Sequence, residues 1–147
     1  MMDQQSDVIR VLLTHPTALV RRSLQFLLSV DPTVRIVGEA SCPTAALGVA
    51  KVTQPDVLLF CDQGKQTDLP EQLSTFRDEV PDCRSVLICC RADRSSLMRC
   101  LEAGTFSIIS QDAEIDDLLR AIHSARNGCL SLSADVAKVL LRHIRTG

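Results

Sequence analysis

Short apolar runs alternate with amphipathic segments along most of the chain. Runs rich in Val, Ile and Leu are typical of strands that are covered on both faces. Five such runs occur, at residues 8–14, 34–40, 57–61, 85–90 and 106–109. Between and after them, apolar side chains recur at helical spacing, over residues 17–30, 43–53, 69–80, 93–104 and 112–127. This alternation predicts an α/β domain built on an open parallel sheet with helices on both sides.

Helix boundaries and one further helix follow from the same pattern. Ser41 or Cys42 is a candidate cap before Pro43, which suits a first helical position, and Asp112 is a candidate cap for the helix that follows the fifth strand. A last amphipathic segment begins at Ser133 and predicts an additional C-terminal helix.

The composition is that of an ordinary soluble globular domain, with 46% apolar and 23% charged residues. The net charge is −2 without a basic run, so we do not expect this chain to hold DNA by electrostatic attraction. No apolar stretch is long enough to span a bilayer, and the first residues lack the features of a signal peptide. We therefore expect a cytoplasmic protein without membrane association.

Seven cysteines are present, and none forms a CxxC pair. This pattern favours neither a disulfide framework nor a structural zinc site. We expect most of them to be small buried side chains, including Cys42, Cys83, Cys100 and Cys129. The chain also lacks a glycine fingerprint and a P-loop, which argues against dinucleotide or nucleoside triphosphate binding. In open α/β sheets the working crevice lies at the carboxyl ends of the strands.

Several motifs occur in a fixed order. They are RVLL at 10–13, VRR at 20–22, VRIVGEA at 34–40, PDV at 55–57, LEAG at 101–104 and LLRAI at 118–122. Together they resemble the receiver domain of bacterial two-component response regulators, and within that family the LuxR-type branch. The resemblance covers roughly residues 9–127. It implies a CheY-like, flavodoxin-like fold: a doubly wound five-stranded parallel sheet of strand order 2-1-3-4-5, here with an extra C-terminal helix.

The resemblance also implies where the family's phosphorylation chemistry would lie. That chemistry uses a pair of acids for Mg²⁺, an acceptor aspartate, a Thr or Ser, a lysine and an aromatic switch residue. In this sequence those positions carry His15 and Pro16, Cys61, Cys89, Gln111 and Ile108, respectively. None retains the required side chain, so we expect no Mg²⁺, no cofactor and no enzymatic activity.

The first interpretation is therefore an atypical, phosphorylation-independent receiver, or pseudo-receiver. It would act in signalling and transcription regulation through dimerisation or a partner protein. We divide the chain into an N-terminal tail at 1–7, the pseudo-receiver domain at 8–128 and a linker-like helix at 129–147. DNA contact is expected only through an output domain not present in this sequence.

Two other interpretations stay open. Cys61 and Cys89, with Cys90 beside them, are candidates for a thiol-based redox sensor in the former phosphorylation crevice. Alternatively, His15, Cys61 and Cys89 are candidate ligands for a soft metal, or the crevice binds a small organic ligand.

Overall fold

The computed structural model describes residues 8–62, 69–89, 94–105, 107–132 and 134–146. The tail at 1–7, Cys90, Phe106 and Ser133 were part of the predictions above and lie outside the described residues. No helix within the described ranges combines the length and the apolar character that a membrane crossing requires.

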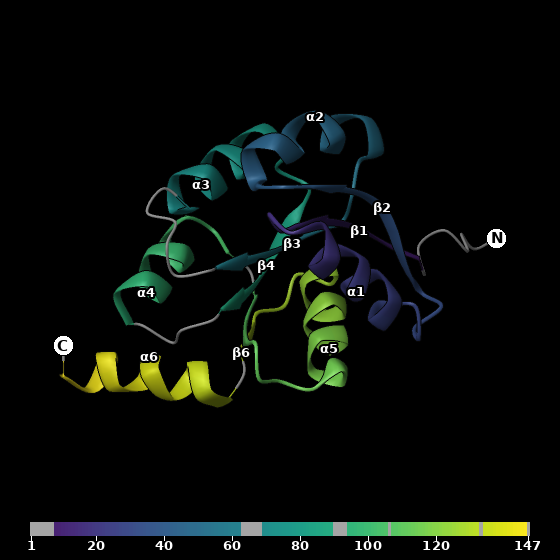
Figure 1. Ribbon diagram of the computed structural model, residues 1–147. Coiled ribbons are helices and arrows are strands. Elements are labelled where there is room, and N and C mark those ends of the chain that lie inside the picture. Colours follow the sequence, from purple (N-terminus) through teal and green to yellow (C-terminus); the bar gives the residue numbers. More distant parts are fainter. Residues whose placement is uncertain (1–7, 63–68, 90–93, 106, 133, 147) are drawn as a thin grey trace.

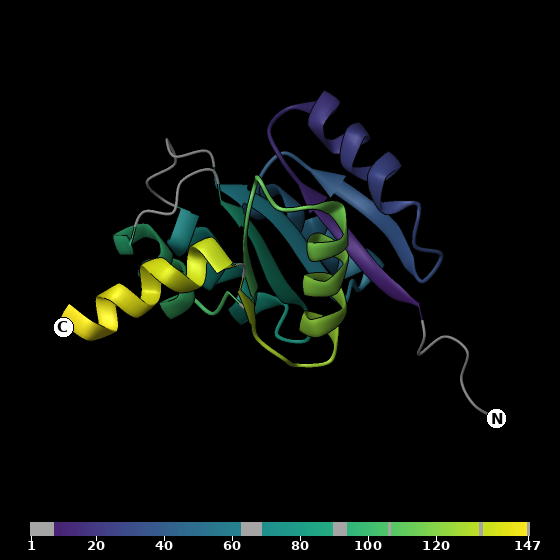
Figure 2. The same ribbon diagram turned by 90° about the horizontal axis from the view of Figure 1, so that it is seen from below.

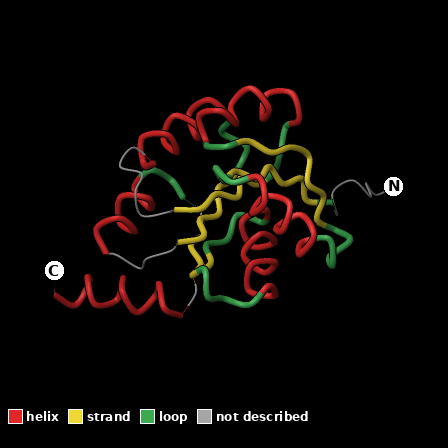
Figure 3. Tube along the Cα trace, in the orientation of Figure 1, coloured by secondary structure: helices red, strands yellow, loops and turns green. Residues whose placement is uncertain are grey.

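A single parallel sheet forms the centre of the molecule, as the strands drawn in yellow show (Figure 3). Its first five strands have the predicted order 2-1-3-4-5, which is confirmed. The prediction of a five-stranded sheet was one strand short, because a sixth strand pairs in parallel with the fifth. With only two residues, that strand is too short to show an alternating pattern. The strands are β1 (Ile9–Thr14), β2 (Val34–Ala40), β3 (Val57–Asp62), β4 (Arg84–Cys89), β5 (Ser107–Ser110) and β6 (Ser131–Leu132).

Helices connect the strands and cover both faces of the sheet, with α2 and α3 over one face and α1 and α5 over the other (Figure 1). They are α1 (Ala18–Leu28), α2 (Pro43–Thr53), α3 (Leu69–Glu79), α4 (Arg94–Glu102), α5 (Ile115–Arg126) and α6 (Ala134–Thr146).

Of the predicted helix caps at Cys42 and Asp112, the first is confirmed and the second is wrong. The Cys42 Sγ accepts the Ala45 N–H at 3.5 Å and caps α2, with Pro43 in its first turn. The expected cap Asp112 is wrong, because Glu114 caps α5. Glu114 and Asp117 form a reciprocal capping box, in which each side chain accepts the other's backbone N–H. This arrangement satisfies two donors at the start of α5, whereas a cap at Asp112 would satisfy neither.

The buried side chains separate into two apolar layers because successive strand residues face opposite sides of the sheet. Leu58, Phe60 and Leu87 belong to the layer under α2, α3 and α4. Leu59 and Val86 belong to the layer under α1 and α5. The position of a strand residue in this alternation therefore decides which helices it meets.

The segment after Gly128 is packed onto the domain. Val136 is fully buried and Leu140 is 8% exposed, and both join the same apolar layer as Cys100 of α4 and Ile108 of β5. Seen from below, α6 lies beside α4, at the opposite side of the molecule from α1 (Figure 2). β6 and α6 thus cover the β5 side of the fold.

Candidate functional site

The carboxyl ends of β1, β3 and β5 meet at one pocket of about 340 Å³ between α1 and α5. Three of the residues singled out from the sequence, His15, Cys61 and Gln111, lie in its wall. The residues that line the pocket are His15, Val20, Leu24, Leu27, Cys61, Ile88, Ile109, Ser110, Gln111, Ala113, Glu114, Ile115 and Leu118.

Strand register explains why residues so far apart in sequence come together here. Leu13 of β1 pairs with Leu59 of β3, so the residues after them lie at the same edge of the sheet. Cys61 then pairs with Ile88, and Ile88 pairs with Ile109 of β5. Because Cys61 is two residues beyond Leu59, both face the α1 and α5 side. A row of side chains from three strands therefore forms the floor of the pocket.

His15 is held firmly at the end of β1 and is only 8% exposed. The Thr17 N–H donates to its Nδ1 at 2.9 Å, and Arg21 donates to its carbonyl oxygen at 2.6 Å. A ring nitrogen that accepts a hydrogen bond carries no proton. Burial lowers the pKa of His15 below its ordinary value, and the positive charge of Arg21 acts in the same direction. His15 is thus a neutral imidazole at neutral pH.

Arg21 also joins α1 to the end of β2. Its Nε lies 2.6 Å from Glu39 Oε1, and Gln25 donates to the other carboxylate oxygen at 2.9 Å. The hydrogen bond from Arg21 is the main cause that lowers the pKa of Glu39. Arg21 therefore holds α1 against the ends of β1 and β2. Because α1 forms one wall of the pocket, these contacts help to position that wall.

Two of the other predicted positions are exposed. Pro16 is exposed after β1, and Gln111 is exposed after β5. Ser110 accepts the Asp112 N–H at 3.1 Å in the same loop. Among the lining residues that the structure describes, the one carboxylate is Glu114, which is engaged as the cap of α5.

These residues do not fit Mg²⁺. That ion requires near-octahedral oxygen ligands, usually including one or two carboxylates. Here the corresponding positions offer an imidazole, a proline ring and a thiol, from His15, Pro16 and Cys61. Across the described part of the chain, no three His, Cys, Asp or Glu residues gather in a way that could hold a metal ion.

The other predicted positions lie around this edge. Cys89 ends β4 and pairs with Asp62, while Cys61 pairs with Ile88, so the two cysteines are one step out of register. The side chains of Cys89 and Asp62, like the whole of Cys90, lie outside the described residues. Ile108, the predicted switch position, is fully buried in the layer under α4 and α6.

The cysteines differ in burial more than predicted. Cys83 and Cys100 are buried, as expected, and burial raises the pKa of the Cys83 thiol to about 12. Cys42 is half-buried as a helix cap. The expectation for Cys129 is wrong, because this residue is exposed in the turn between α5 and β6, directly after Gly128, whose φ is positive.

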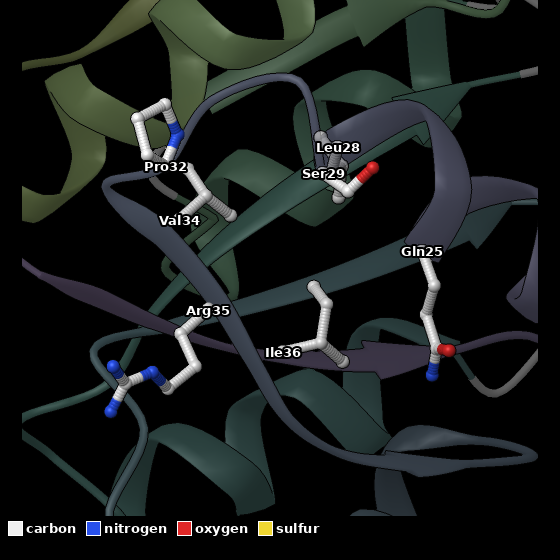
Figure 4. A pocket seen from close by; sticks show the side chains of 7 residues that line it. All are labelled: Gln25, Leu28, Ser29, Pro32, Val34, Arg35 and Ile36. Carbon is white, nitrogen blue, oxygen red and sulfur yellow. The ribbon is translucent and has the colours of Figure 1, made fainter.

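A second pocket, of about 370 Å³, lies between the end of α1 and the start of β2 (Figure 4). Gln25 of α1 and Ser29, just after that helix, face Ile36 of β2 across it. Its one ionisable lining residue is Arg35, which is exposed. No predicted site residue lines this pocket, and it lies toward the amino ends of the strands.

Sequence reasoning missed the apolar walls of the first pocket. Val20, Leu24 and Leu27 of α1 line it, although their helical spacing predicted core positions only. Ile115 and Leu118 of α5 form the opposite wall. The spacing marks an apolar helix face but does not distinguish a face that meets the sheet from one that borders a hollow.

No protein-family model matches the chain. It is 27% identical over 145 residues to the nitrate/nitrite response regulator NarL of Escherichia coli, covering 99% of this chain and 66% of that protein. The nitrate/nitrite response regulator homologue of Haemophilus influenzae is 27% identical over 135 residues, with 92% and 65% covered. The chain thus spans slightly less than two thirds of these curated relatives.

Solved structures show the same fold. A LuxR-family two-component response regulator from Aurantimonas has a TM-score of 0.84 at 20% identity, covering 95% of this chain and 99% of that one. A structure described as two RcsB dimers bound to two parallel DNAs has a TM-score of 0.78 at 16% identity, with 90% and 68% covered. The chain is therefore homologous to NarL/LuxR-type response regulators and has the fold of their receiver domain.

Proposed function

We propose that this chain is a receiver domain that works without aspartyl phosphorylation, through contact with a second copy of itself or with a partner protein. The observation that carries the proposal is the shared pocket of His15, Cys61 and Gln111. Phosphoryl transfer depends on metal ions and cationic groups that neutralise the developing charge. An imidazole and a thiol do not supply the oxygen ligands that Mg²⁺ prefers, and none of the imidazole, the thiol and the amide supplies the cationic group.

The absence of an aromatic residue at the family's switch position supports the same proposal. Ile108, at the position of the family's aromatic switch, is buried among Leu87, Cys100 and Val136. An aliphatic side chain enclosed in this way lacks the second, exposed position that an aromatic switch alternates with. We therefore expect a single conformation of the region around Ile108 to dominate.

The direct test is incubation with acetyl phosphate and Mg²⁺, followed by intact-protein mass spectrometry. We expect no gain of a phosphoryl group, while a receiver that retains the acids, the acceptor and the lysine serves as the positive control. The matched variants Cys61→Ser and Asp62→Asn locate any label that forms. A near-stoichiometric phosphoryl adduct that Asp62→Asn abolishes would disprove the proposal.

Self-association is supported by exposed apolar side chains on α1. Leu19 is 75% exposed and Phe26 is 77% exposed, and Val30 just after the helix is 67% exposed. Apolar side chains that cluster on a surface favour association. The fold similarity to RcsB, whose structure is described as dimers bound to DNA, supports a dimer here. Contact with DNA is assigned in this proposal to another domain, since this chain has a net charge of −2.

Sedimentation velocity tests this part of the proposal. We expect a dimer whose population does not change with acetyl phosphate and which Phe26→Asp shifts to monomer. Val52→Asp is the matched control, because Val52 is 84% exposed on α2 and lies away from α1. A dimer that responds equally to both substitutions, or to acetyl phosphate, would contradict it.

A further inference from the structure

We infer that the pocket between α1, α5 and the carboxyl ends of the strands binds a small, neutral, mainly apolar organic molecule that carries one polar group. The inference rests on the proposed function, in which this crevice no longer receives a phosphoryl group. It deepens that function by naming the class of molecule that the crevice takes instead.

The dimensions suit a small molecule. At about 340 Å³, the pocket lies in the range of roughly 300–1,000 Å³ that is usual for ligand sites. It is bounded on three sides, by α1, by α5 and by the sheet edge at Cys61 and Ile109. Such an enclosure distinguishes it from the exposed apolar face of α1 around Phe26.

Its walls are apolar. Val20, Leu24 and Leu27 repeat at helical spacing along α1, and Ile115 and Leu118 face them from α5. Aliphatic walls on both sides of a hollow of this size are in contact with water when no ligand fills it, which is unfavourable. An apolar molecule placed there gains the burial of its own surface and that of these side chains.

Polar side chains line the pocket along the edge where the strands finish. His15 follows β1 and is more than nine-tenths buried, Cys61 lies in β3, and Ser110 and Gln111 lie at and just after the end of β5. Hydroxyl, amide and imidazole groups orient a ligand through directed hydrogen bonds. One polar group on the ligand, such as a hydroxyl, a carbonyl or an amide, matches this polar edge of the pocket.

The described lining favours a neutral ligand. No lysine or arginine stands among the described lining residues, so these residues offer a phosphate or carboxylate no counter-charge. The one carboxylate among them, Glu114, already caps α5 through its bond with the Asp117 N–H. A neutral ligand is therefore favoured over an anion and over a cation.

The test uses N-phenyl-1-naphthylamine, a neutral fluorophore whose emission rises in apolar surroundings. The probe is titrated into the whole chain, and the oligomeric state of each variant is measured at the same concentration. We expect saturable binding at one probe per chain. Leu27→Glu, at a half-exposed wall position, should weaken binding about tenfold or more, because it places a charge in the apolar wall. Val20→Phe, which fills the pocket with added volume, should weaken it similarly.

Val52→Glu is the matched control, since it introduces the same charge at an exposed apolar side chain of α2 that does not line the pocket. The affinity of this variant for the probe should remain within about twofold of the wild type. Absent binding, or binding lost with Val52→Glu but retained with Leu27→Glu and Val20→Phe, would overturn the inference. Acetyl phosphate labelling is measured on the same samples. An unlabelled protein that binds no probe refutes this inference alone, whereas a labelled protein refutes the proposed function.

Discussion

His123 of α5 lies 2.9 Å from Asp31 in the turn between α1 and β2. The Thr33 hydroxyl donates to the same carboxylate at 2.6 Å and lies 3.3 Å from the imidazole. This cluster joins the turn after α1 to α5. It therefore helps to fix the distance between α1 and α5, the two helices that border the pocket.

A double-mutant cycle of Asp31→Asn and His123→Ala measures this link. We expect a coupling free energy of about 0.5–1 kcal/mol near pH 6, since the pair is partly exposed to solvent. Urea unfolding of the four proteins gives the value. Strictly additive effects would show that the two side chains do not interact.

Stability should decrease at acidic pH because of two carboxylates. The Thr33 hydroxyl and then His123 lower the pKa of Asp31, and Arg21 lowers that of Glu39, from ordinary values of 3.8 and 4.5. The unfolded chain therefore binds protons at a pH where the folded chain does not. The stabilisation is complete above about pH 5 and is lost as the pH falls through the lowered pKa values.

Glu39→Gln and Asp31→Asn should each flatten the fall in unfolding free energy between about pH 5 and pH 3. The exposed Glu102→Gln is the control, because Glu102 has no described ion pair. Equal slopes for all three variants would argue against the assigned causes.

Thiol labelling should separate the cysteines by burial. With a pKa of about 12, the Cys83 thiol is only about one part in ten thousand ionised at pH 8, and it is buried. Iodoacetamide should therefore modify the exposed Cys129 first and leave Cys83 and Cys100 unmodified in the folded protein. Peptide mapping of samples quenched at different times gives the order in which the cysteines are alkylated. Early alkylation of Cys83 would contradict its burial in the core.

The same maps test the redox interpretation. Positions one step out of register on neighbouring strands are poor disulfide partners, because successive residues face opposite sides of a sheet. Cys61 and Cys89 are such positions. We expect peroxide to leave them unlinked, and a Cys61–Cys89 disulfide in the oxidised digest, absent from Cys61→Ser, would restore the sensor as a candidate.

Helix α6 should contribute to the stability of the domain. Leu140 is 8% exposed and packs in the layer that contains Val136, whereas the neighbouring Leu141 is 57% exposed. Leu140→Ala should therefore lower the unfolding free energy by about 2–4 kcal/mol, and Leu141→Ala by less than about 0.5 kcal/mol. Equal small effects would mean that α6 is a detached linker in solution.

Much of the fold could be predicted because its strands are continuous apolar runs. The prediction for residues 34–40 matches β2 at both ends, and Pro43 marked the start of α2. β6 could not be predicted, since Ser131 and Leu132 form a strand only by pairing with Ser107 and Ile108. The same holds for Cys129, whose exposure depends on how the chain turns after Gly128.

The candidate site was predictable in its positions but less so in its shape. Order along the strands placed His15, Cys61 and Gln111 at one edge, and the structure brings all three to one pocket. The hollow itself depends on where α1 and α5 lie. The Arg21–Glu39 pair joins α1 to β2, and the Asp31–His123 pair joins the turn after α1 to α5. Such long-range pairs leave no periodic signal in a sequence.

The short length of β6 also makes the two borders of the sheet unequal. β6 offers two residues, whereas β2 offers seven and pairs on one side only, with β1, among the described strands. Unpaired backbone donors and acceptors along a border strand are the template for strand addition by another polypeptide. An extended peptide that lengthens this sheet would therefore align along β2, beside the exposed Arg35.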